Sequence, residues 1–178
     1  MSKFDIVAIS TPKRADGKLV YANGEEKLLK YGITEVTKDT YRSDSEAVSI
    51  ILPSSVVSIG DGAFEGFENL KSIILPESVT EIGSSAFSNC MSLESIEIPH
   101  DVLLIGKCAF CSCRSLESVK IPFGIEMIER DAFNGCESLR NIYYDGTKKD
   151  WQAIFISKIG NGKICGKKAE IAKIHYKN

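Results

Sequence analysis

A 23-residue period runs through the middle of this 178-residue chain. Four of its five prolines recur at this spacing, as do sets of alanine, phenylalanine, leucine and isoleucine residues. Examples are Pro53, Pro76, Pro99 and Pro122, and Phe64, Phe87, Phe110 and Phe133. So many positions with one period identify an internal repeat, and repeats of this length are typical of solenoids.

One copy of the repeat predicts the course of a single coil. The segment Leu93-x-x-Ile96-x-Ile98 has the alternation of a strand, and Pro99 ends its hydrogen-bonded ladder. Gly106 then indicates a tight corner, for which a positive φ is open to glycine. Further on, apolar residues recur at three-to-four spacing, as on a short helical turn. These are Ala109, Phe110, Cys113 and Leu116.

A unit this short cannot bury its apolar face alone, so the copies must stack. The expected fold class is an α/β-type repeat solenoid with a parallel strand ladder and short helical or 3-10 turns. Its expected parts are an N-terminal segment and hairpin cap over 1–46, the solenoid over 47–144, and a C-terminal cap over 145–178. Asn23-Gly24 between apolar runs predicts the hairpin, and we expect Trp151 to plug the open end of the core.

The repeat resembles the BspA-like (bacterial surface antigen) class of leucine-rich repeat. The resemblance rests on the pattern Leu-x-x-Ile-x-(Ile/Leu)-Pro-x-x-(Val/Leu)-x-x-Ile-Gly-x-x-Ala-Phe-x-x-Cys and covers residues 47–144. It implies a secreted or cell-surface protein that binds host proteins or other cells. The first residues lack the apolar stretch of a secretory signal, so a cytoplasmic location is the alternative.

The side chains on either side of the central strand residue are expected to face outward in two columns. The small polar column comprises Ser49, Ser72, Ser95, Ser118 and Asn141, and the variable column comprises Ile51, Ile74, Glu97, Lys120 and Tyr143. Exposed apolar and aromatic residues together indicate an interaction patch. The candidate partner-binding residues are Ile51, Ile74, Glu97, Lys120, Phe123 and Tyr143. Alternatively, the caps or residues 1–16 cover the two isoleucines.

These features favour a non-enzymatic module for protein recognition or adhesion. The alternatives are a structural spacer of a longer surface protein, or glycan or polyanion binding through the basic C-terminal tail. From residue 145 onward there are eight lysines against three acids. These lysines are dispersed and the chain has one tryptophan, so we expect no nucleic-acid binding. We expect no membrane insertion, because no apolar run approaches about 18 residues. The oligomeric state is left open.

No motif for catalysis, for a cofactor or for a metal is evident in the sequence. Cys90, Cys113 and Cys136 share one repeat position and are expected to form a buried stack. Cys108 and Cys111 fall at positions that are polar in other copies, so they are interpreted as incidental surface thiols, with a redox couple or a local disulfide as alternatives. Cys165 is unassigned, and the two histidines show no ligand spacing.

Overall fold

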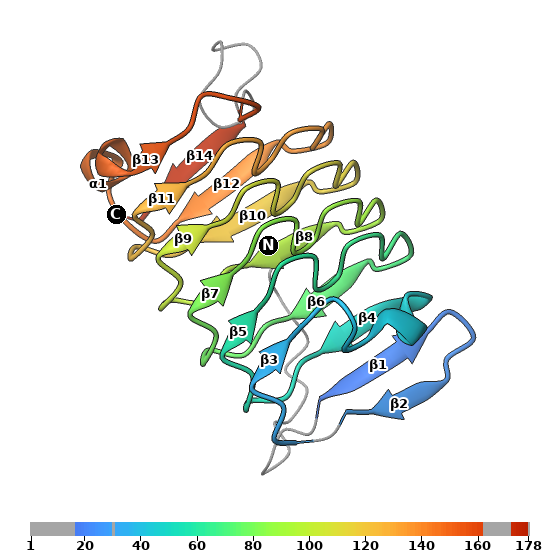
Figure 1. Cartoon of the computed structure of the whole chain (residues 1–178). Helices are drawn as coiled ribbons and strands as arrows, with labels where there is room; N and C mark the ends of the chain where they lie inside the picture. The colour runs from blue at the N-terminus through green and yellow to red at the C-terminus, as the bar shows by residue number, and fades with distance from the viewer. Residues whose placement is uncertain (1–16, 30, 162–171, 178) are drawn as a thin grey trace.

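The computed structural model of the chain is a solenoid of stacked coils (Figure 1). It describes residues 17–29, 31–161 and 172–177. Each complete coil contributes one longer strand, one two-residue strand and the turns between them. The predicted fold class, a leucine-rich repeat solenoid with parallel strands and little helix, is confirmed. The domain boundaries given above stay a prediction.

The longer strands form the first ladder. They are β4 (Ala47–Ile51), β6 (Ser72–Ile74), β8 (Ser95–Glu97), β10 (Ser118–Ile121), β12 (Asn141–Tyr144) and β14 (Lys173–Tyr176). Parallel pairing joins β4 to β6 in one sheet, and joins β8 to β10, β10 to β12 and β12 to β14 in a second sheet, so the hydrogen-bonded ladder is interrupted between β6 and β8. Where strands of successive repeats pair, the paired residues are 23 positions apart, as Ile50 and Ile73 are. The sequence period is therefore the register of the sheet.

A second parallel ladder consists of two-residue strands. They are β3 (Glu35–Val36), β5 (Ser58–Ile59), β7 (Glu81–Ile82), β9 (Leu104–Ile105), β11 (Met127–Ile128) and β13 (Phe155–Ile156). The sequence pattern predicts the first ladder but not this one, because two residues are too few to show an alternating pattern. The isoleucine of each repeat points inward here and is fully buried at Ile59, Ile82 and Ile105.

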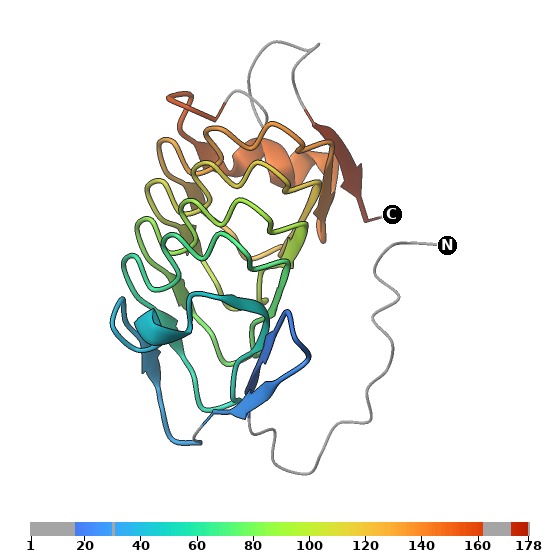
Figure 2. The ribbon, with the colours of Figure 1, turned by 90° about the vertical axis from the view of Figure 1, so that its right-hand side faces the viewer.

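Stacked phenylalanines run through the core along the solenoid. The rings of Phe64, Phe87, Phe110 and Phe133 follow one another with centroids 5.2–5.3 Å apart. The turns that carry them stack along one side of the solenoid (Figure 2) and are closed by 3-10-type backbone bonds, such as the one from Cys113 N–H to the Phe110 carbonyl. The three-to-four spacing in the sequence thus corresponds to consecutive tight turns rather than to an α-helix.

The predicted buried cysteine stack is present. Each thiol donates a hydrogen bond of 3.1–3.2 Å to a phenylalanine carbonyl of the preceding coil. The pairs are Cys90 with Phe64, Cys113 with Phe87, and Cys136 with Phe110. Burial raises the pKa of Cys90 and Cys136 to about 12, so these thiols stay protonated and act as small apolar side chains that tie neighbouring coils together.

The repeated glycine has a different role from the one expected. Gly106 does not have the positive φ that is open to glycine at such a corner. Instead, a Cβ atom at Gly106 would lie 2.8 Å from the carbonyl carbon of Gly83 in the preceding coil. The left-handed residue of the turn comes two positions later, at Ser85 and Cys108. At Gly83 and Gly106 glycine leaves room for the backbone of the preceding coil, whereas Glu129 stands at this position in the next coil.

The N-terminal end is closed by the predicted hairpin, in which β1 (Lys18–Tyr21) pairs antiparallel with β2 (Glu26–Leu28). Strand β1 also pairs antiparallel with β4 and so occupies the edge of the first ladder. The 3-10 helix η1 (Arg42–Asp44) anchors the hairpin. Its buried Asp44 accepts hydrogen bonds from Lys27 Nζ at 2.8 and 2.9 Å and from the Tyr21 hydroxyl at 2.6 Å.

At the opposite end of the stack lies α1 (Lys148–Ala153), whose first turn has a capping box between Thr147 and Asp150 (Figure 1). The side chain of Trp151 is 7% exposed and packs edge-on against Tyr144 with ring centroids 5.2 Å apart. Trp151 therefore closes the end of the core, as expected from the sequence.

Replacing Gly106 by alanine should lower the free energy of unfolding by about 1–3 kcal/mol, because the added methyl group meets rigid backbone of the preceding coil. The midpoint of thermal unfolding should fall by about 2–4 °C for each kcal/mol. Gly124→Ala is the control, since a Cβ there lies 3.2 Å from its nearest atom, the His100 carbonyl oxygen. An equal loss in the two variants would contradict the close approach of coils at Gly106.

Replacing Asp44 by asparagine should destabilise the protein by about 1–3 kcal/mol at neutral pH, because charge-assisted hydrogen bonds are lost. Burial alone would raise the pKa of Asp44, but the bonds from Lys27 and Tyr21 outweigh it and hold the pKa below its ordinary value. The carboxylate therefore stabilises the fold above pH about 4, and this stabilisation disappears as the pH falls through the lowered pKa.

The measurement is urea unfolding of wild type and Asp44→Asn between pH 2.5 and 7. The difference between them should shrink at the acid end. Asp39→Asn is the control in the same cap, because Asp39 is 83% exposed and pairs with Arg42 only at 3.6 Å. A pH-independent difference for Asp44→Asn would show that the charge of Asp44 has no role in anchoring the hairpin.

Candidate functional site

The outward surface of the first ladder, here called the strand face, carries both predicted columns. Its residues are Ser49, Ile51, Ser72, Ile74, Ser95, Glu97, Ser118, Lys120, Asn141, Tyr143, Lys173 and His175. Inward residues alternate with them, buried in β4 to β12 and partly buried in β14, which fixes the outward direction of each column. Pairing from strand to strand places Glu97 beside Lys120, and Lys120 beside Tyr143.

The N-terminal part of the strand face is apolar. Ile51 is half-buried, and Ile74 is 41% exposed. The hairpin does not lie over these side chains: it pairs with β4 edge to edge, so that Lys18 lies opposite Ile51 and Val20 opposite Ser49. Among the described residues, the N-terminal cap thus extends the strand face instead of covering it. Residues 1–16, the other expected cover, lie outside the described residues.

The middle of the strand face holds an ion pair. Lys120 Nζ donates to Glu97 Oε1 and lies 3.7 Å from an Asp145 carboxylate oxygen. The bond to Glu97 raises the pKa of Lys120, so this lysine stays charged throughout the physiological range. Because both partners are partly exposed, the pair contributes little to stability, at most about 1 kcal/mol. Its main effect is to place opposite charges at the centre of the surface.

The C-terminal part of the strand face is aromatic. The ring of Tyr143 stacks on the ring of His175 with centroids 4.6 Å apart. A hydrogen bond of 3.0 Å between His175 Nε2 and Asn141 Oδ1 orients the imidazole. Phe123, in the turn after β10, is 62% exposed, and its carbonyl accepts a hydrogen bond from the Tyr144 hydroxyl. The structure therefore holds Tyr143 in a fixed orientation and leaves Phe123 open to solvent.

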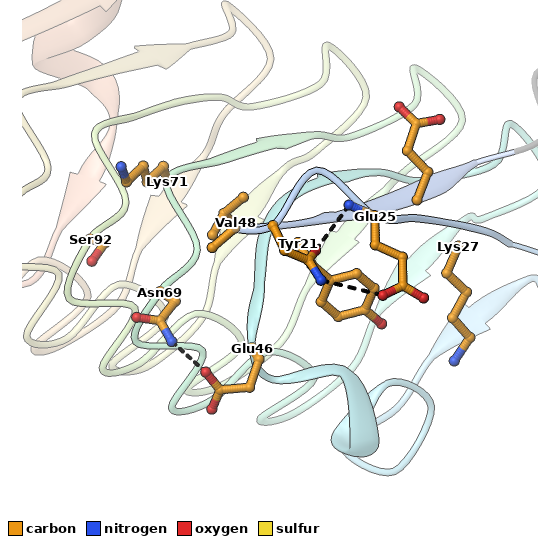
Figure 3. Close-up of a pocket in the computed structure, with 11 residues that line it drawn as sticks. Tyr21, Glu25, Lys27, Glu46, Val48, Asn69, Lys71 and Ser92 are labelled. Atoms are coloured by element: carbon orange, nitrogen blue, oxygen red, sulfur yellow. Dashed lines mark hydrogen bonds between the residues drawn. The ribbon is translucent and has the colours of Figure 1, made fainter.

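A groove of about 780 Å³ adjoins the apolar part of the strand face, between the hairpin turn and the starts of β4 and β6 (Figure 3). Tyr21 and Glu25 lie on its hairpin side, and Lys71 and Ser92 lie on its coil side. The Asn69 amide donates a 2.7 Å hydrogen bond to Glu46 at its border. The sequence does not predict this groove, because the repeat period does not determine where the hairpin packs.

The structure thus aligns five of the predicted residues on one ladder and leaves Phe123 in a neighbouring turn. It also adds His175, whose position beside Tyr143 was missed. The signal that points to it is the alternation in Ile174-His175-Tyr176, which matches Ile142-Tyr143-Tyr144. The pairing distance here is 32 residues rather than 23, so the repeat period does not predict it.

Ionisable groups near the strand face have ordinary surface chemistry. His100, in the turn after β8, lies 2.7 Å from a Glu77 carboxylate oxygen and 3.3 Å from one of Asp101. The hydrogen bond to Glu77, followed by the charge of Asp101, raises the pKa of His100. Across residues 17–29, 31–161 and 172–177, no group of three His, Cys, Asp or Glu side chains could hold a metal ion.

Comparison with known proteins gives a family match. The model of the BspA type leucine-rich repeat region matches residues 34–158 in six copies. No curated protein matches significantly. None of the helices in the described part of the chain is long and apolar enough to span a membrane.

Solved structures of leucine-rich repeat proteins are similar to this chain. A leucine-rich cell surface protein from Faecalibacterium prausnitzii is 34% identical with a TM-score of 0.66, and the match covers 78% of this chain and 40% of that one. A leucine-rich repeat protein of T. pallidum is 29% identical with a TM-score of 0.60, over 75% of this chain and 70% of that one. The chain therefore spans less than half the length of the Faecalibacterium protein.

Replacing Glu77 by glutamine should lower the pKa of His100, because it removes the carboxylate that stabilises the imidazolium. An NMR titration of the imidazole protons measures this change. Glu81→Gln is the matched control, since Glu81 bonds to Ser58 rather than to His100. An unchanged His100 pKa in Glu77→Gln would mean that the contact does not persist in solution.

Proposed function

We propose that this chain, which belongs to the BspA-type leucine-rich repeat family, is a non-enzymatic module that recognises a protein partner through its strand face. The family is associated with protein-binding or structural repeat roles, and its structural neighbours include cell surface proteins. We further propose a cell-surface location, where the partner is another surface protein or a host protein.

The observation that carries this proposal is the exposure of large apolar and aromatic side chains on a rigid ladder and in the turn beside it. Ile74 and Phe123 are 41% and 62% exposed. Such side chains act as anchors in protein interfaces when a partner removes them from water. Because the strands are fixed by the coils beneath them, binding would order few groups on this side of the interface, which lowers its entropic cost.

The charges on the strand face suit a polar interface surrounding these anchors. Glu97 and Lys120 form a pair that a partner can contact without having to neutralise a lone charge. Mutating such exposed charges changes the association rate and the salt dependence more than the affinity. We therefore assign the anchoring role to Ile51, Ile74, Phe123 and Tyr143, and the orienting role to Glu97 and Lys120.

The test is a pull-down from surface and soluble extracts, followed by titration of the purified partner. Tyr143→Ala should weaken binding at least fivefold, as expected for an anchor worth about 1 kcal/mol or more. Ile74→Arg should abolish capture, because it places a charge in the apolar part of the interface.

Leu104→Arg is the matched control, because Leu104 is 37% exposed and lies on the second ladder rather than on the strand face. A partner that Leu104→Arg retains and Ile74→Arg loses supports the proposal. Loss in both variants, or in neither, argues against the strand face. Capture of a partner that falls steeply with added salt and is unchanged by both substitutions would favour polyanion binding by the basic tail. If no partner is captured specifically, a structural spacer is favoured.

A further inference from the structure

Cys108 and Cys111 lie together in one turn between β9 and β10. The same turn in the preceding coil holds Ser85 and Ser88 at the corresponding positions, and the next coil holds Asp131 and Asn134. The turn keeps its backbone conformation in all three coils, with φ of 55°, 57° and 59° at its first residue. The two thiols are therefore not required to form the turn.

The backbone places the two cysteines at the ends of one hydrogen-bonded turn. The Cys111 N–H donates a hydrogen bond of 2.9 Å to the Cys108 carbonyl. A bond of this kind closes a four-residue turn whose outer Cα atoms are within about 7 Å of each other. Disulfides span Cα distances of about 4.4–6.8 Å. The Cys111 thiol is also close enough to Cys108 to be among the groups that raise its pKa.

Accessibility separates this pair from the other described cysteines. Cys108 and Cys111 are partly exposed, whereas Cys90, Cys113 and Cys136 are buried and donate to carbonyl oxygens. A small oxidant in solution can therefore reach Cys108 and Cys111 but not the three buried cysteines. The sequence also places these two cysteines three residues apart, the spacing found in reversible dithiols.

We propose that Cys108 and Cys111 form a reversible disulfide by exchange with a small-molecule disulfide such as glutathione disulfide. One cysteine thiolate attacks the small disulfide, whose S–S bond breaks and releases one small thiolate. The second cysteine thiolate then attacks the resulting mixed disulfide and releases the second small thiolate. The two protein thiols lose two electrons, the small disulfide gains them, and the two thiol protons pass to solvent or to the released thiolates.

The rate at which the disulfide forms depends on pH. Burial, together with the neighbouring Cys111 and Asp131, raises the pKa of Cys108. Only the thiolate attacks, so oxidation accelerates as the pH rises toward the pKa of Cys108. The product is a disulfide that cross-links the turn of a single coil, outside the strand face.

The test uses the full chain at pH 8 in a glutathione buffer that contains excess glutathione disulfide. The reaction is quenched with acid, free thiols are alkylated after denaturation, and the protein is digested with trypsin. Cleavage after Lys107 and Arg114 releases a peptide with Cys108, Cys111 and Cys113. The expected product carries one alkyl group and lacks two hydrogen atoms, with fragmentation placing the alkyl group on Cys113. Added dithiothreitol should restore a triply alkylated peptide.

Cys108→Ser is the control variant, because serine stands at the same position in the preceding coil, and its thermal unfolding should match that of the wild type. It should yield Cys111 alkylated or joined to glutathione, with no internal disulfide. A wild-type peptide that remains triply alkylated would overturn the proposal. So would a mixed disulfide that never closes, a bond from either cysteine to Cys165, or an internal disulfide that persists in Cys108→Ser.

Discussion

Contact between successive coils is the interaction on which this structure depends. A single coil has two short strands and a set of turns, and neither its apolar side chains nor its backbone groups are satisfied within it. The neighbouring coil supplies both: Phe87 stacks on Phe110, and the Phe87 N–H bonds to the Ala109 carbonyl. The cysteine thiols add a further bond between adjacent coils at the same level. Stability therefore resides in the interfaces between repeats rather than in any one of them.

The fold and its interior are predictable from the sequence because stacking imposes one period on every buried position. Phe64 and its three equivalents must lie one above another, and a substitution at one level would leave a gap against two neighbours. The same argument orients the outward columns, since residues such as Ser72 and Ile74 flank a buried position of known direction. Their assignment to partner binding is a proposal that periodicity alone cannot test.

Four features of the structure were not predictable from the sequence pattern. The second ladder consists of strands too short to show alternation, and the requirement for Gly106 comes from the backbone of another coil rather than from its own φ. The groove beside the hairpin depends on the antiparallel pairing of β1 with β4, and the stacking of Tyr143 on His175 depends on a longer final connection. In these last two cases the determining contact joins segments that the repeat does not relate.

The constant pairing distance of 23 residues has a kinetic consequence. Every loop that must close to join one coil to the next has the same moderate length, so no pairing within the array carries a large entropic penalty of closure. Folding can begin at any two adjacent coils and spread in both directions by adding one coil at a time. The anchored hairpin and Trp151 then oppose unfolding from the two ends, because the terminal coils are the ones with a single neighbour.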